Sequence, residues 1–323
     1  MSRVMKTVAI GFTSYRPETV PFAERAMQGF GAVALEEPQT PGFEEMVRGE
    51  LDMDEYLLLT DYQFPEYARS FCAMLRRLLG QGTELYQIDP FMDELVRIHE
   101  FFAGGGSPQE LQAGTLTMEV YECERLWTGK LIGFYEQSMR SGFDALVRSV
   151  QAFARADAEK GRLRDRLRAD KLLELLPRVS SLYVEAGYIH FVLLQELLRR
   201  LPAGCRLKPV HLMESAARPL CGRRRVLGPG DVLTLLYTCR PEYEGQRADV
   251  LAARSLVYNK MIEKEEMAGQ DGEFPHLRNE CVVVGAVASL SYEECRRVFE
   301  RVRRLPTREA RSYVLRWIER RGS

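Results

Sequence analysis

One stretch in the middle of the chain constrains the fold more than any other. The run from Ser181 to Gly187 is short, apolar and rich in Tyr and Val, which is typical of a buried strand. From Phe191 onward, apolar residues recur with helical spacing, at positions 191, 194, 197, 198 and 201. We therefore expect a strand, a tight turn at Gly187 and a helix, with Glu185 near the end of the strand and His190 at the start of the helix. Ligands of open parallel sheets bind beyond the carboxyl ends of strands, where both side chains are expected.

The N-terminal part of the chain alternates between predicted strands and helices. Apolar runs predict strands around 8–10, 32–35 and 83–88, and helical patterns lie between them at 21–28 and 64–79. This order at short spacing is the signature of a parallel sheet with right-handed crossovers. The predicted fold class is therefore α/β, with a mainly parallel central sheet flanked by helices.

The remaining segments define the expected domain organisation. We expect an α/β core over residues 1–240, interrupted by a long helical insertion at about 91–177. Residues 241–323 are expected to form a C-terminal α/β extension packed on the core. Three further strands are predicted at 207–213, 231–237 and 281–287.

Composition excludes several classes of protein. The chain has 323 residues, with 45 Lys and Arg against 46 Asp and Glu, so its net charge of −1 disfavours nucleic acid as a partner. No run approaches the apolar length of a membrane span, and the N-terminus lacks the apolar region of a signal peptide, so we expect no membrane span and a cytoplasmic location. Seven cysteines without C-x-x-C spacing argue against a disulfide framework or a zinc site.

Three acidic residues and one histidine are the strongest candidates for chemistry. The helix N-terminus disfavours a charged imidazole at His190, so we expect a neutral ring that acts as a base, an acceptor or a metal ligand. The alternative is a histidine that caps the helix or packs in the core. Glu185 lies on a strand predicted to be buried, where a carboxylate needs a partner. Its alternative role is a salt bridge to an arginine of the helical insertion. Glu36 and Glu37 follow the second strand, and only one of them is expected to face a cleft.

A second group of residues follows the ends of the predicted strands. Ser14, Tyr15 and Arg16 follow the first strand, where they either bind a ligand or only form a turn. Asp89 follows the third strand and could instead cap the helix that begins near Phe91. Arg162, Arg164, Arg166 and Arg168 spread around a helix, so most of them are expected in solvent and one or two could turn into a cleft.

The order of these elements resembles a known superfamily over about residues 7–200. The segments that carry the resemblance are Gly11 to Ser14, Ala34 to Glu37, Ile88 to Pro90, and Arg164 to His190. The chain is similar to the superfamily that groups erythromycin esterases, ChaN-like haem-binding proteins, TraB-type proteins and Tiki proteases. Members pair two Gly-x-x-His motifs with acidic residues at the ends of parallel strands.

The resemblance assigns residues to both motifs. Gly187 and His190 match the second motif, and Glu36 or Glu37 would be the acid of the family. At the first motif Gly11 is present, but Ser14 stands where the family has histidine. The two-histidine site of the family cannot be built from Ser14. We therefore expect no cofactor, since the ligand count does not support haem or a divalent metal.

Two functions follow as hypotheses. In the first, the protein is a hydrolase of ester or peptide bonds, with His190 as general base and with Glu36 or Glu37 and Glu185 orienting it. In the second, it binds a small molecule or a haem-like group without turnover. Gly11, Ser14, Tyr15, Arg16, Asp89 and Gly187 would line the ligand site in either case.

Overall fold

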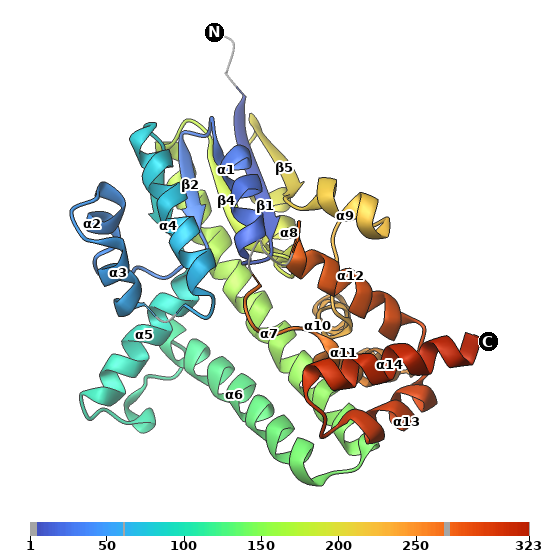
Figure 1. Ribbon diagram of the computed structural model, residues 1–323. Helices are drawn as coiled ribbons and strands as arrows, with labels where there is room; N and C mark the ends of the chain where they lie inside the picture. The colour runs from blue at the N-terminus through green and yellow to red at the C-terminus, as the bar shows by residue number, and fades with distance from the viewer. Residues whose placement is uncertain (1–4, 61, 268–271, 323) are drawn as a thin grey trace. The chain divides into compact units, whose positions relative to one another are not determined.

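The computed structural model describes residues 5–60, 62–267 and 272–322, and the chain forms two compact units. Unit 1 comprises Met1–Tyr121 and Gly161–Ser215, and unit 2 comprises Glu122–Lys160 and Ala216–Ser323. This division differs from the expected core of residues 1–240 and extension of residues 241–323. The chain crosses between the units three times. Two crossings fall inside long helices, α6 (Leu116–Arg140) and α7 (Phe143–Leu175), and the third falls inside the short helix α9 (Glu214–Cys221) (Figure 1).

Unit 1 contains a parallel sheet with the strand order β3-β2-β4-β1-β5. The strands are β1 (Lys6–Thr13), β2 (Ala32–Leu35), β3 (Glu84–Gln87), β4 (Leu182–Gly187) and β5 (Cys205–His211). All residues of β2 and β4 are buried, as expected for parallel strands covered on both faces. The prediction of an α/β fold with a mainly parallel sheet is confirmed.

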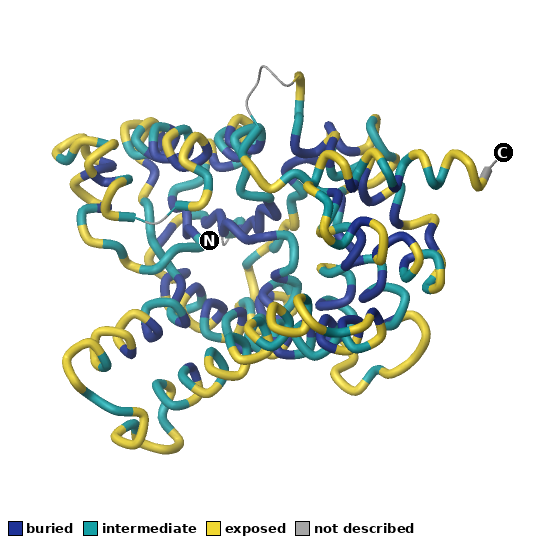
Figure 2. Tube along the Cα trace, turned by 60° about the horizontal axis from the view of Figure 1, so that its bottom comes forward, coloured by how far each residue is buried: buried dark blue, intermediate teal, exposed yellow. Residues whose placement is uncertain are grey.

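Helices cover the two faces of this sheet and form separate hydrophobic clusters. Along β1, Ala9 packs into one cluster, whereas Val8 and Ile10 pack into the other, because side chains alternate along a strand. The first cluster includes residues of α1 (Val20–Met27), α2 (Phe43–Arg48), α3 (Met53–Leu59) and α4 (Pro65–Gly80). The second includes residues of α7 and α8 (Phe191–Arg200). Figure 2 shows the buried residues along the strands and the inner sides of the helices.

The register of the sheet brings distant residues to one edge. Gly11 of β1 pairs with Glu185 of β4, and Ala34 of β2 pairs with Val184. Because the strands are parallel, their carboxyl ends lie along the same edge of the sheet. The segments that follow β1, β2 and β4 therefore meet there.

The long insertion at 91–177 is helical, as predicted. It contains α5 (Pro90–Ala103), α6, α7 and two short 3₁₀ turns, η2 (Pro108–Glu110) and η3 (Leu176–Arg178); a third, η1 (Pro17–Thr19), precedes α1. The strand expected at 207–213 is β5, which lies at an edge of the sheet. Its edge position accommodates Pro209, which cannot donate a backbone hydrogen bond.

Two predicted strands are wrong. Residues 231–237 lie in α10 (Pro229–Cys239), which begins with proline at its first position and a carboxylate of Asp231 that accepts from the Gly228 amide. Residues 281–287 lie in α12 (Pro275–Ala288), whose buried residues recur at 277, 283, 284 and 287. Short apolar runs in a buried helix and in a buried strand look alike in sequence.

Unit 2 is helical throughout its described part, so the expected α/β character of the C-terminal extension is also wrong. Its remaining helices are α9 (Glu214–Cys221), α11 (Gln246–Met261), α13 (Tyr292–Val302) and α14 (Thr307–Gly322). One hydrophobic cluster joins the first half of α7 with α10 to α14. Over the described ranges, no helix is both long and apolar enough to cross a membrane.

Candidate functional site

Glu36 lies at the centre of a buried polar cluster in unit 1. It directly follows β2, and only 3% of its side chain is exposed. Its Oε2 accepts hydrogen bonds from the Tyr15 hydroxyl at 2.6 Å and from the Gly187 amide at 2.7 Å. Its Oε1 lies 2.8 Å from Nε2 of His190. Residues from the ends of β1, β2 and β4 therefore meet at one carboxylate.

His190 is held between two carboxylates. Nε2 contacts Glu36, and Nδ1 contacts Oδ1 of Asp165 on α7. The other Asp165 oxygen accepts from the Leu193 amide at 2.9 Å, which caps the first turn of α8. Burial alone would lower the pKa of His190, but the negative charges of Glu36 and Asp165 raise it to about 9. The imidazole is thus a cation at neutral pH, and the expectation of a neutral ring is wrong.

Two arginines of α7 complete the charge balance. Arg164 Nη2 lies 3.1 Å from Glu36 Oε1, and Arg164 also binds Asp89 with Nε at 2.8 Å. Arg168 Nη1 lies 3.6 Å from Glu36 Oε2. Burial would raise the pKa of Glu36, but His190, Arg164 and Arg168 together hold it well below its usual value. Glu36 is therefore ionised at neutral pH.

Arg168 is fully buried and links the ends of three strands. Nε donates to the Ile88 carbonyl at 2.9 Å, and Nη2 donates to the carbonyls of Leu35 at 3.3 Å and Glu185 at 3.0 Å. These carbonyls stand at or just beyond the carboxyl ends of β3, β2 and β4. The guanidinium thereby ties together backbone carbonyls from three strands, in addition to the bond that the Leu35 carbonyl accepts from the Ile88 amide at 3.2 Å.

Glu185 differs from Glu36 in its protonation. Its Oε2 accepts from the Glu36 amide at 3.2 Å, and the residue is 3% exposed. Burial and, to a smaller extent, the negative charges of Glu37 and Glu36 together raise its pKa to about 8. The expected alternative, a salt bridge to an arginine of the insertion, is not what the structure contains, because Arg168 binds the backbone carbonyl of Glu185. Glu185 is a carboxyl that titrates near neutral pH.

Glu37 points away from His190. Its Oε1 accepts from the Tyr62 hydroxyl at 3.1 Å, and its Oε2 accepts from Gln87 Nε2 at 3.2 Å. Burial raises its pKa, and these two hydrogen bonds oppose the increase. As predicted from strand alternation, only one acid of the Glu36 and Glu37 pair joins the histidine.

The two glycines serve different purposes. A Cβ on Gly11 would lie 1.6 Å from the hydroxyl oxygen of Tyr183, so this position has no room for a side chain. A Cβ on Gly187 would lie 3.3 Å from Cδ2 of His190, and its amide binds Glu36. Gly11 therefore supports packing, whereas Gly187 is part of the polar cluster.

The other predicted residues divide between the cluster and its surroundings. Tyr15 is a member, and burial followed by the charge of Glu36 raises the pKa of its phenol well above 10.0. Asp89 joins through Arg164, and it also caps α5 by accepting from the Met92 amide at 3.3 Å. The Ser14 carbonyl accepts from the Arg16 amide at 2.8 Å in a turn. Arg16 stacks on Phe64, with Cζ 4.0 Å from the ring centre.

Sequence reasoning missed Asp165 and assigned no role to Arg164 and Arg168 individually. All three lie in a helix so rich in charge that a buried subset is not apparent. The available signal was the i, i+4 spacing of the two arginines, which places them on one face.

The residues do not fit a metal or a haem. Within the described ranges, no group of three or more His, Cys, Asp or Glu side chains is arranged to hold a metal ion. Both ring nitrogens of His190 contact carboxylates, so neither is open to iron.

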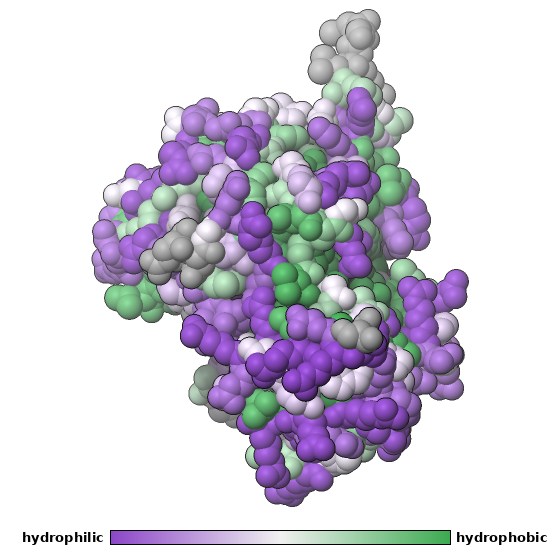
Figure 3. All heavy atoms as spheres, turned by 45° about the vertical axis from the view of Figure 1, so that its right-hand side comes forward, coloured by the Kyte–Doolittle hydropathy of each residue, from purple (hydrophilic) through white to green (hydrophobic). Residues whose placement is uncertain are grey.

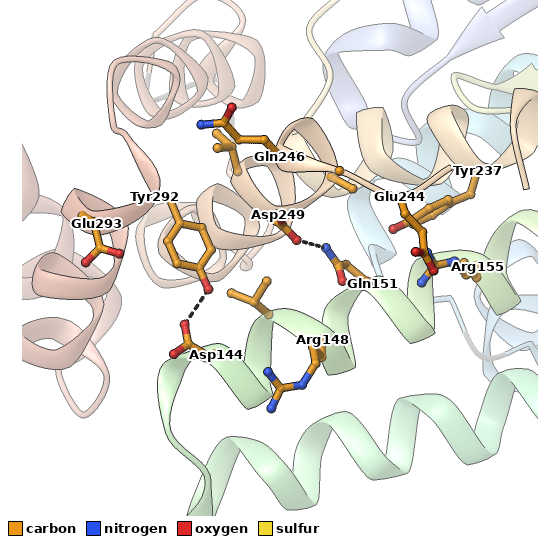
Figure 4. A pocket seen from close by; sticks show the side chains of 14 residues that line it. Asp144, Arg148, Gln151, Arg155, Tyr237, Glu244, Gln246, Asp249, Tyr292 and Glu293 are labelled. Atoms are coloured by element: carbon orange, nitrogen blue, oxygen red, sulfur yellow. Dashed lines mark hydrogen bonds between the residues drawn. The ribbon is translucent and has the colours of Figure 1, made fainter. Parts of the chain in front are cut away.

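Each unit also contains a cavity of more than 500 Å³ outside the cluster. One of about 520 Å³ in unit 1 is lined in part by Thr40, Phe43 and Gln87. Gln87 accepts from the Thr40 amide at 3.0 Å and donates to Glu37, so it stands between this cavity and Glu37. A second cavity, of about 960 Å³, lies in unit 2 between α7, α11 and the start of α13 (Figure 4). None of the predicted site residues lines it.

Comparison with known proteins gives one informative match. The chain is 31% identical over 291 residues to an uncharacterized protein of Archaeoglobus fulgidus, and the alignment covers 90% of this chain and 97% of that protein. No protein-family model and no solved structure matches the sequence. The similarity thus spans nearly the full length of both chains, but the matched protein, being uncharacterized, indicates no activity.

Proposed function

Since the chain belongs to the same family as the archaeal protein that it matches, we propose that this family consists of hydrolases of ester or peptide bonds, related to the erythromycin esterase, ChaN-like, TraB and Tiki superfamily. The observation that carries the proposal is the pair of buried carboxyls Glu36 and Glu185. Glu36 is surrounded by cations and donors, whereas Glu185 accepts one hydrogen bond from the Glu36 amide. Two carboxyls with opposite pKa shifts at one site are typical of acid–base catalysis.

In the proposed reaction, Glu185 replaces His190 as the general base. The Glu185 carboxylate takes a proton from water, the hydroxide adds to the substrate carbonyl, and the same proton then passes to the leaving oxygen or nitrogen. His190 and Arg164 supply positive charge near the oxyanion, and Glu36 and Asp165 are positioning residues that hold His190.

A pH profile tests this assignment. Hydrolysis requires ionised Glu185 and protonated His190, so kcat/KM should rise toward pH 8 and fall above about pH 9. A panel of esters and peptides is the probe. Glu185→Gln should lower kcat/KM by about 10²–10⁴-fold and remove the lower limb of the profile.

Glu196→Gln is the matched control, since Glu196 is also a nearly buried acid of unit 1 and pairs with Arg200 at 3.6 Å. The control should keep wild-type rates. Equal activity of Glu185→Gln and wild type on every substrate would reject the hydrolase proposal.

The cavity beside Gln87 favours a second candidate, binding of a small molecule without turnover. Gln87 lines this cavity and donates a hydrogen bond to Glu37, whose pKa is raised. A small molecule in the cavity could bind Gln87 and, through it, be coupled to the Glu37 carboxyl. A panel of small polar compounds should contain at least one that raises Tm of the wild type but not of Gln87→Met. Gln81→Met, at an exposed glutamine of the same unit, is the control. A panel without any such compound would contradict this candidate.

A further inference from the structure

The near-neutral charge of the whole chain hides an uneven distribution. Unit 1 has 19 Lys and Arg against 25 Asp and Glu, which gives a net charge of −6. Unit 2 has 26 Lys and Arg against 21 Asp and Glu, which gives +5. The exclusion of nucleic acid rested on the total charge, so it does not hold for unit 2 taken by itself.

The excess of unit 2 resides in its last two helices. Residues 292–322, which span α13 and α14, contain ten arginines, no lysine and five glutamates. The net charge of this helical pair is therefore +5, equal to that of the whole unit. In Figure 3, hydrophilic side chains dominate the lower part of the view.

Most of these arginines have no partner among the residues that the structure describes. Three are engaged: Arg296 with Asp144, Arg303 with the carbonyls of Ser138 and Ser141, and Arg321 with Glu294. Six others are exposed, and no ion pair or hydrogen bond joins their side chains to another described residue. We call these six the arginine surface: Arg297, Arg301, Arg304, Arg308, Arg316 and Arg320.

The spacing of the arginine surface fits a polyanion. Arg297 and Arg301 of α13 follow i, i+4 spacing, and Arg304 lies in the turn just after that helix. On α14, Arg316 and Arg320 also follow i, i+4 spacing, so each helix carries a charged pair on one face. Neighbours four residues apart are separated by about 6 Å along a helix axis. A nucleic-acid strand carries one phosphate charge about every 3.4 Å along its axis. Arginines about 6 Å apart can therefore each contact a different phosphate of the same strand.

Two observations favour nucleic acid over an anionic membrane. A helix that lies on a membrane inserts exposed apolar side chains, but no large hydrophobic residue of 292–322 is exposed. Those on α13 and α14 instead pack into the unit 2 core, including Val298, Phe299 and Val314. The basic residues of 292–322 are all arginine, whose guanidinium matches phosphate geometry better than an ammonium does.

We propose that the arginine surface of α13 and α14 binds the phosphodiester backbone of nucleic acid without sequence preference. The contacts are to phosphates, which give affinity and a steep dependence on salt but no base readout. This proposal is independent of the hydrolase proposal, because no residue of the arginine surface belongs to the polar cluster of unit 1.

The test is fluorescence anisotropy of the full chain with labelled DNA duplexes and with single-stranded RNA of the same length, each in two unrelated sequences. If six arginines contact a duplex, the slope of log K against log salt is about −5, and affinity falls by about 10³-fold between 50 and 200 mM salt. Both sequences should bind equally. Comparison of the affinities for DNA and RNA shows which nucleic acid the arginine surface prefers.

The decisive variant is the triple substitution Arg297→Gln, Arg301→Gln and Arg304→Gln, which should reduce the salt slope by about 3. The control triple, Arg125→Gln, Arg140→Gln and Arg240→Gln, removes the same charge from exposed arginines elsewhere in unit 2 and should bind like the wild type. Equal weakening by both triples, absence of binding at low salt, or binding to phosphatidylserine vesicles in preference to nucleic acid would each overturn the proposal.

Discussion

At the scale of single residues, His190 is defined by its two carboxylate neighbours rather than by the helix that it precedes. A helix N-terminus disfavours a cation by at most about 1–2 kcal/mol. Two carboxylates in direct contact with the ring nitrogens outweigh that effect, and Asp165 also satisfies the Leu193 amide at the helix start. The site is therefore an ion cluster in which the pKa of Glu185, about 8, lies closest to neutral pH and that of His190, about 9, lies above it.

Stability should fall as pH rises from about 6.5 to 9. The folded protein binds the His190 proton more tightly than the unfolded chain does, since the pKa rises from 6.5 to about 9. This contribution is complete below pH 6.5 and is lost as pH rises through 9, a decrease on the order of 3 kcal/mol by linkage. Urea denaturation across this range measures the decrease. His190→Gln should reduce it, whereas His99→Gln, at an exposed histidine, should leave it unchanged.

Gly11→Ala should destabilise unit 1 through a single contact. The new methyl group would lie 1.6 Å from the hydroxyl oxygen of the fully buried Tyr183, so the tyrosine ring or the strands around it must shift. The expected loss of unfolding free energy is about 1–3 kcal/mol. Gly80→Ala is the control because a Cβ there meets nothing within 4 Å. Comparable urea midpoints for the two variants would contradict this account.

At the scale of elements, the polar ends of the parallel strands were predictable from the sequence. The contacts that α7 makes with those strand ends were not. Periodicity placed Glu36, Glu185 and His190 near one edge, because each follows or ends an apolar run. It could not show that Arg168 of α7 reaches three strand carbonyls, since a charged helix looks solvated in sequence. Periodicity was also wrong about the strands at 231–237 and 281–287, because short apolar runs in buried helices look like buried strands.

Arg168→Lys should therefore weaken the sheet although it keeps the charge. A lysine ammonium is a compact donor on a flexible chain and cannot reproduce the planar set of donors that reaches three carbonyls. The Leu35 carbonyl keeps the bond from the Ile88 amide, but the carbonyls of Ile88 and Glu185 lose their bonds from the guanidinium. Each lost bond to a charged donor costs about 1–3 kcal/mol, so a loss of roughly 3 kcal/mol is expected in urea denaturation. Arg166→Lys, on the exposed side of the same helix, should change stability by less than about 0.5 kcal/mol.

At the scale of the whole molecule, averages over the chain conceal two different bodies. The net charge of −1 combines an acidic α/β unit with a basic helical unit. The cores are separate too, since the hydrophobic cluster of unit 2 shares no residue with the two clusters that flank the sheet. Sequence patterns predicted the sheet unit well because strands and helices alternate there, but they contain no comparable signal for the boundary at 215–216.

Separate cores predict separate unfolding. Leu233→Ala removes a fully buried side chain from the unit 2 cluster and should cost about 2–5 kcal/mol. If each core is a cooperative unit, amide hydrogen exchange should accelerate in α10 to α14 while β1, β2 and β4 keep wild-type protection. Leu182→Ala, in the core of the sheet, should produce the reverse pattern. Acceleration of both units by either variant would mean that the chain unfolds as one body despite its two cores.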